Sequence, residues 1–266
     1  MDSRLNELFF SQSALGAFLN CQLKFRRRYL DGLFWPGSWA LDAAGREALE
    51  HGRLFHLLAQ RYFSSGEEKD YGLVPLQDWF RLLREFRSND PSLVFQPEQE
   101  LRLNSRGMKL MAKFDLLAFA PDGRVLVYDW KTSDSVPKQE YCRKHLQTLV
   151  YRYVVCAAGE ACSPYGKVEP EAVSMLYWNP RHPGTPVVLP YSRRQFTQDE
   201  EYLRKLVGEI VTRNPAEFFA TTDVKRCRHC EYAAVCLGER AAEVDVEEDE
   251  DDLSLDWDSI DEIAPL

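Results

Sequence analysis

Short apolar runs alternate with polar residues through the middle of the chain, and apolar residues recur at helical spacing on either side of them. Five stretches have the composition of strands: residues 98–104, 109–120, 124–130, 172–178 and 186–190. Four stretches have helical spacing: residues 12–30, 42–63, 76–87 and 138–158. The residues Thr197-Gln198-Asp199-Glu200 form a capping-box pattern, which predicts one more helix, ending near residue 213. A helix between the third and fourth strands acts as a crossover, so the pattern predicts an α/β fold with a central mixed sheet flanked by helices.

The third predicted strand carries charged residues at its end. It reads Val127-Tyr128-Asp129-Trp130-Lys131-Thr132. Residues two apart in a strand point the same way, so Asp129 and Lys131 are expected to face one site. The turn residues Pro121-Asp122-Gly123 fold the preceding strand, which carries Asp115, back beside them.

Two aspartates and a lysine at one place predict a specific chemistry. Carboxylate oxygens suit Mg²⁺ or Mn²⁺, and a lysine near such an ion can orient a water for attack on phosphorus. This pattern favours metal-dependent phosphodiester hydrolysis. The alternative for an isolated Asp-x-Lys is an exposed ion pair at the end of a strand.

The order of motifs resembles the PD-(D/E)XK nuclease superfamily, in its RecB-like branch. The motifs are residues 52–56 with His56, then Asp115, then residues 129–131, then residues 147–151. The resemblance covers most of residues 11 to 236 and implies a restriction-endonuclease-like core. It departs from the superfamily at Phe114, where the name of the superfamily has proline, and at Ala112, where many relatives carry glycine.

The resemblance also implies roles for individual residues. His56, Asp115, Asp129 and the backbone carbonyl of Trp130 would bind the divalent metal, and Lys131 would be the catalytic lysine. Gln147 and Tyr151, four apart on one helix, would contact DNA and support the site. The alternatives are a hydrogen-bonded core histidine for His56 and aromatic packing for Tyr151.

Cysteines form a second pattern. Cys227, Cys230 and Cys236 are closely spaced near the end of the predicted folded region, and Cys21 lies near its start. Such spacing is typical of thiolates around one metal centre. Residues 21–25, Cys-Gln-Leu-Lys-Phe, are similar to the corresponding stretch of iron-sulfur RecB-like nucleases, in which one N-terminal and three C-terminal cysteines hold a 4Fe-4S cluster. The alternative is structural zinc, bound by four thiolates or by three together with His229.

The other cysteines, Cys142, Cys156 and Cys162, are expected to be ordinary thiols. The chain shows no secretory signal and no apolar run of membrane-spanning length, so a reducing, cytoplasmic location without membrane association is expected.

Charge is unevenly distributed. The net charge is −9, yet 12 of the 42 acidic residues lie between positions 243 and 262, where no lysine or arginine occurs. The remainder of the chain is mildly basic, which is compatible with a DNA partner. The basic run Lys24, Arg26, Arg27 and Arg28 is expected either to line a DNA groove or to be a solvated helix face.

These observations predict one nuclease domain over residues 1–240, followed by an acidic, disordered tail over residues 241–266. The domain would comprise an N-terminal helical lobe (1–90), a catalytic core (91–195) and a helix with a C-terminal cysteine cluster module (196–240). The expected activity is Mg²⁺- or Mn²⁺-dependent hydrolysis of DNA, as an exonuclease or flap nuclease on single-stranded DNA or free ends. DNA repair, recombination or CRISPR spacer acquisition would be its setting, and the tail could recruit a protein partner such as an integrase or helicase. The alternative is a non-catalytic DNA-binding or assembly module with a structural zinc or iron-sulfur site.

Overall fold

The computed structural model describes residues 2–35, 41–66, 72–87, 90–136, 138–228 and 230–238. The chain divides into two compact units. We call residues 50–204 the sheet unit, and residues 1–49 together with 205–266 the cysteine unit. Residues 50–87 thus belong with the sheet, whereas the sequence analysis had grouped them with the first 49 residues. His229 and the acidic tail lie outside the described residues.

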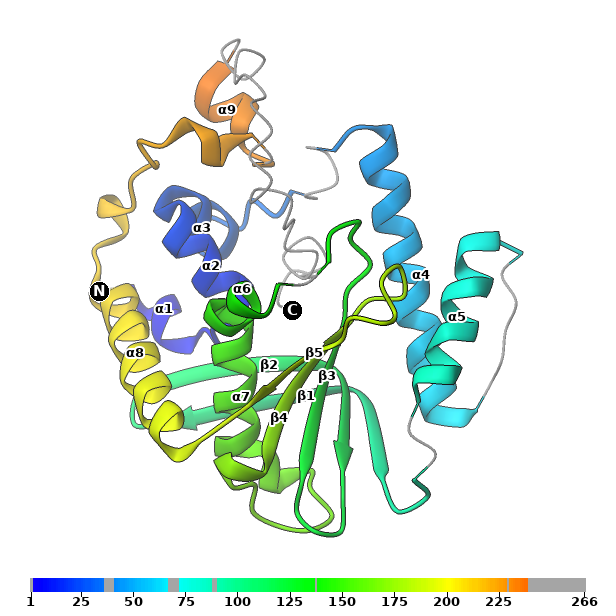
Figure 1. Ribbon diagram of the computed structural model, residues 1–266. Helices are drawn as coiled ribbons and strands as arrows, with labels where there is room; N and C mark the ends of the chain where they lie inside the picture. Colours follow the sequence, from blue (N-terminus) through cyan, green and yellow to red (C-terminus); the bar gives the residue numbers. More distant parts are fainter. Residues whose placement is uncertain are drawn as a thin grey trace. The chain divides into compact units, whose positions relative to one another are not determined.

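A five-stranded mixed sheet forms the centre of the sheet unit (Figure 1). The strands, in spatial order, are β1 (Val94–Ser105), β2 (Met108–Phe119), β3 (Val125–Trp130), β4 (Val173–Trp178) and β5 (Val187–Pro190). Neighbours are antiparallel except for β3 and β4, which are parallel. All five strands coincide closely with the stretches expected from the sequence, and the mixed α/β fold is confirmed.

The turn between β2 and β3 forms as expected. Gly123 adopts a φ of +87°, a conformation that glycine tolerates without strain, and its N–H donates to the Ala120 carbonyl at 2.9 Å. The hairpin therefore brings the end of β3 beside the middle of β2.

Helices cover both faces of the sheet. Two of them, α4 (Ala43–Ser65) and α5 (Val74–Phe86), share one buried core cluster with β2, β3 and β4, in which the Phe55 ring contacts both Trp79 and Trp178. The other face packs against α7 (Leu146–Ala158), which follows the short α6 (Gln139–Lys144) in the crossover from β3 to β4 (Figure 1). Strand β3 is consequently buried on both sides.

The crossover was expected as one helix over residues 138–158, but it is broken at His145. His145 has an extended backbone, and the Cys142 carbonyl released by the break accepts a hydrogen bond from the Thr148 hydroxyl. Neither glycine nor proline marks this position, so no local signal predicted the break.

The last long helix also differs from its expectation. Helix α8 (Arg193–Thr212) begins four residues before the expected capping box at residue 197. Ser192 provides the cap instead: the Gln195 N–H donates to Ser192 Oγ at 3.3 Å, and Ser192 Oγ donates to Gln195 Oε1 at 2.9 Å. Thr197 lies within the helix, where its hydroxyl donates to the Arg193 carbonyl.

The cysteine unit contains the N-terminal helices α1 (Ser3–Glu7), α2 (Gln12–Asn20) and α3 (Gln22–Tyr29). Its C-terminal part contains the 3-10 turns Pro215–Glu217 and Val224–Cys227 and the helix α9 (Ala233–Leu237). The single helix expected over residues 12–30 is divided at Cys21, whose backbone is extended. Phe25 packs between Phe18 and Phe218, which ties the two ends of the chain together.

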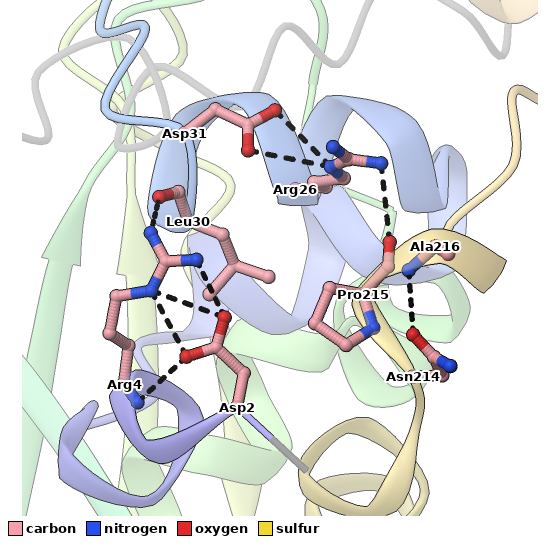
Figure 2. Close-up of polar contacts among 8 residues, drawn as sticks. All are labelled: Asp2, Arg4, Arg26, Leu30, Asp31, Asn214, Pro215 and Ala216. Carbon is pink, nitrogen blue, oxygen red and sulfur yellow. Dashed lines mark hydrogen bonds and ion pairs between the residues drawn. The ribbon is translucent and has the colours of Figure 1, made fainter.

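Most of the basic run serves this packing. Arg26 contacts Asp31 and the Pro215 carbonyl (Figure 2). Arg28 and Lys24 both pair with the buried Glu231, at 3.1 Å and 2.9 Å. These side chains hold the N-terminal helices to the C-terminal residues, so a purely solvated helix face does not describe them.

Within the described residues, no helix combines the length and the apolar character needed to cross a membrane.

Candidate active site at the middle of β2 and the end of β3

His56 and Asp115 form the first group of the site. Asp115 projects from β2, and His56 lies on α4, one turn after Gly52. His56 Nδ1 is 3.1 Å from Asp115 Oδ1, and the Trp130 N–H donates to Asp115 Oδ2 at 2.6 Å. The β2–β3 ladder ends at the pair Leu116–Tyr128, so the Asp115 carboxylate takes the N–H of a residue just past the last position at which β3 pairs with β2.

Burial by itself would raise the pKa of Asp115. The charge and hydrogen bond of His56, the Trp130 N–H and the charge of Lys131 outweigh that effect and hold the Asp115 pKa below its ordinary value. The carboxyl group is therefore ionised at neutral pH, as a metal ligand must be.

Asp129, Lys131 and Gln147 form the second group. Lys131 Nζ lies 2.9 Å from Asp129 Oδ2 and donates to Gln147 Oε1 at 3.0 Å. Gln147 Nε2 donates to Asp129 Oδ1 at 2.7 Å. Asp129 and Lys131 face the same side of the strand end, as expected. Asp129 and Gln147 are buried, and this closed ring of contacts fixes the direction of the ammonium group.

Backbone contacts hold this strand end in place. The Lys131 N–H donates to the Trp178 carbonyl at 2.8 Å, which extends the β3–β4 pairing by one residue. The buried Asn179 donates to the Ser133 carbonyl at 2.8 Å. The residues that follow Lys131 are thus anchored to the end of β4.

Trp130 and Tyr151 contribute mainly packing among the contacts described. The Trp130 ring lies in the aromatic core, stacked on Phe63, while its N–H reaches Asp115. Tyr151 is buried and packs edge-on against Phe114, with ring centroids 4.9 Å apart. Phe114, where the superfamily name has proline, thus supports the helix that carries Gln147.

Glu98 is a residue of the site that the sequence analysis missed. It lies on β1, and its carboxylate, the Asp115 carboxylate and a His56 ring nitrogen place one ligand atom each within 4.8 Å of one another. Among the described residues, these three are the histidine, cysteine or acidic side chains that lie close enough together, as a group of at least three, to hold a metal ion. Burial and the negative charge of Asp115 raise the pKa of Glu98, against the opposing effect of Lys113. Without the register of β1 on β2, no feature separates Glu98 from the other acidic residues nearby.

His145 was also missed. Burial and the charge of Lys131 lower its pKa to about 4, so the imidazole beside the site is neutral at pH 7.

The four cysteines of the predicted cluster all belong to the cysteine unit. Burial and the neighbouring thiols of Cys21 and Cys236 raise the pKa of Cys227. Burial is the main reason that the pKa of Cys230 rises to about 11. All seven cysteines are free thiols, and burial raises the pKa of Cys142 to about 11.

Comparison with known proteins gives one family and one fold. A family model described as the PD-(D/E)XK nuclease superfamily matches residues 9–89 and 73–237. A crystal structure from Eubacterium rectale, described as a "Putative exonuclease", superposes with a TM-score of 0.53 at 13% sequence identity, over 86% of this chain and 88% of that chain. At this identity the likeness shows the fold alone. A search of curated proteins finds no match.

Proposed function

The chain belongs to the PD-(D/E)XK nuclease superfamily, and from this membership we propose that it is a metal-dependent deoxyribonuclease of the RecB-like branch. Its substrate would be DNA with single-stranded ends or flaps, cleaved by an exonuclease or flap-nuclease activity in the cytoplasm. DNA repair, recombination or CRISPR spacer acquisition would be its setting. The observation that carries the proposal is the convergence of an ionised carboxylate, an imidazole and a fixed ammonium group at the middle of β2 and the end of β3.

The donor set fits a hard divalent cation. Carboxylate oxygens and an imidazole nitrogen are ligands that Mg²⁺ and Mn²⁺ accept, and His56, Asp115, Asp129 and the Trp130 carbonyl would hold such an ion. When bound, the ion would stabilise the charge that develops on the phosphate oxygens.

Lys131 would position the water that attacks phosphorus. The contacts of its ammonium group with Asp129 and Gln147 restrict it to one direction, which is the requirement for orienting a nucleophile. Gln147 acts through Lys131 and Asp129 in this proposal, and Tyr151 supports the helix from which Gln147 projects.

The test is cleavage of labelled single-stranded DNA with Mn²⁺. Lys131→Ala should abolish cleavage and leave DNA binding nearly unchanged, whereas Lys167→Ala, which removes an exposed pair with Glu169, should leave both unchanged. Metal-dependent cleavage retained by pure Lys131→Ala protein would refute the role of Lys131. If the wild-type protein cleaves none of the DNA ends tested, a non-catalytic DNA-binding module would be favoured.

Cys21, Cys227, Cys230 and Cys236 would hold a 4Fe-4S cluster. Beside the main effect of burial, Cys21 contributes to the raised pKa of Cys227 and of Cys230, and Cys236 contributes to that of Cys227, which supports the proximity of these thiols. Structural zinc, bound by the same four thiolates or by three of them together with His229, is the alternative.

Anaerobic purification tests the cluster. We expect absorbance at about 400 nm that is lost in Cys230→Ser and retained in Cys156→Ser. Stoichiometric zinc without this absorbance would refute the iron-sulfur assignment. The tail over residues 243–262 would recruit an integrase or helicase, and recovery of the same partners with and without residues 243–266 would contradict that role.

A further inference from the structure

Three side chains from three elements surround one point of the proposed active site. His56 comes from α4, Asp115 from β2 and Glu98 from β1, and one ligand atom of each lies within 4.8 Å of the other two. The sequence motifs of the site include only the first two. Glu98 therefore needs its own explanation.

The position of Glu98 is strained. Its neighbours Pro97 and Gln99 pair with Leu116 and Phe114, so Glu98 lies across from Asp115 in the sheet. Its φ is +53°, in the left-handed region that residues other than glycine rarely occupy. Strained backbone of this kind persists where the surrounding structure enforces it, often at functional sites. Here it occurs where the Glu98 carboxylate lies close to His56 and Asp115.

Glu98 also has a charged partner within the chain. Lys113 Nζ lies 2.5 Å from Glu98 Oε2, and the Lys113 side chain is 60% exposed. Two carboxylates this close repel each other, so a positive charge beside them stabilises the protein without metal. An exposed ammonium is a weak partner and is readily displaced by a divalent cation.

We infer that Glu98 is a ligand of the divalent cation, together with His56 and Asp115, and that Lys113 is the counter-ion that the cation displaces. The inference rests on the proposed function and deepens it. Asp129, the ligand from β3 in the proposed function, is not part of this group of three, and its two carboxylate oxygens contact Lys131 and Gln147. The cation would thus be held from β1 as well as from β2 and α4.

The experiment is a calorimetric titration of the full-length protein with Mn²⁺, without DNA. Glu98→Gln keeps the length of the side chain and removes its charge, and it should weaken Mn²⁺ binding about 100-fold, the upper end of what supporting residues of metal sites cost. Lys113→Gln removes the competitor and should tighten binding about threefold. The two changes have opposite signs.

Glu100→Gln is the matched control. Glu100 lies on the same strand, opposite Lys113 in the register, and pairs with Arg102 at 2.7 Å. Glu100→Gln removes the same charge two residues from Glu98, so it should change the Mn²⁺ affinity less than about threefold. If Glu98→Gln and Glu100→Gln weaken Mn²⁺ binding equally, the effect comes from the loss of any negative charge near the site, and the inference is overturned.

Asp115→Asn and His56→Ala separate this inference from the proposed function. If both abolish Mn²⁺ binding while Glu98→Gln does not change it, Glu98 is no ligand and the metal site of the proposed function remains. If neither weakens binding, the proposed metal site itself is wrong. Circular dichroism checks the fold of each variant. Should Glu98→Gln fail to fold, unchanged or weaker binding by Lys113→Gln would still overturn the inference.

Discussion

A close contact between α4 and the residue after Lys131 provides a sharp test of the site geometry. A Cβ placed on Gly52 would lie 2.9 Å from Thr132 Oγ1, inside the 3.4–4 Å of ordinary van der Waals contact. Gly52→Ala therefore requires the Thr132 side chain, the helix or the strand end to move by about 0.5 Å, and we expect part of this shift to reach the helix. His56 lies one turn further along the same helix, 3.1 Å from Asp115, so the shift falls on the proposed metal ligands.

The expected effect on stability is small, and the effect on activity is larger. Overpacking costs about 1–3 kcal/mol. Replacing a helical glycine by alanine returns about 1 kcal/mol, so the free energy of unfolding should fall by only about 1 kcal/mol. A misplacement of about 1 Å can cost about 100-fold in rate, so a shift of half that size predicts about a tenfold loss in kcat/KM.

Thr132→Ala should rescue this loss. The Thr132 Cβ is 3.9 Å from the added methyl group, an ordinary contact, so removal of the hydroxyl relieves the clash. The double variant should cleave DNA within about threefold of Thr132→Ala alone. Gly208→Ala on α8 is the control, because its Cβ would meet nothing within 4 Å. A double variant as impaired as Gly52→Ala, or a Gly52→Ala protein with full activity, would refute the reasoning.

Three further predictions concern residues around the site and in the cysteine unit. The pKa of His145 is lowered to about 4 from the ordinary 6.5, so protonation of His145 favours the unfolded chain. Between pH 7 and pH 5 the wild type should lose about 2 kcal/mol of unfolding free energy that His145→Gln keeps, measured by urea denaturation at each pH. The same loss in both proteins would contradict this prediction. Glu231→Gln leaves the buried Arg28 without its carboxylate and should lower the unfolding free energy by about 3 kcal/mol, measured by urea denaturation; a change below about 1 kcal/mol would mean that the pair is dispensable. Gln147→Met removes the hydrogen bonds of the amide with Lys131 and Asp129, and it should lower kcat about 10- to 100-fold with little change in KM. A purely structural role of Gln147 predicts lower stability with unchanged kcat instead.

Local patterns in the sequence predicted the strands well. Short apolar runs between turn residues specify strands because alternate side chains point to opposite faces, and this holds whatever the strands pair with. The same periodicity placed Asp129 and Lys131 on one side of β3, and the structure joins them at 2.9 Å. The nearness of Asp115 on β2 to Trp130 on β3 was likewise accessible, because the hairpin at Gly123 is a local feature.

Helix boundaries were less predictable. The helices divide at Cys21 and at His145 without glycine or proline, and long-range contacts stabilise the segments that follow: the Leu23 N–H donates to the Phe219 carbonyl, and the Thr148 hydroxyl contacts the Tyr177 hydroxyl. The capping box at residue 197 failed for a related reason. Ser192 and Gln195 form a similar pattern five residues earlier, and no feature of the sequence alone decides which of the two begins the helix.

The sequence by itself determined the elements, the family and the residues that share a strand or a helix, because each of these depends on interactions between near neighbours in the chain. The tertiary structure decided which charges meet. It paired Lys24 and Arg28 with Glu231, more than 200 residues away, and it placed Glu98 across from Asp115. Both outcomes depend on strand register and on chain closure, which are set by packing over long sequence distances.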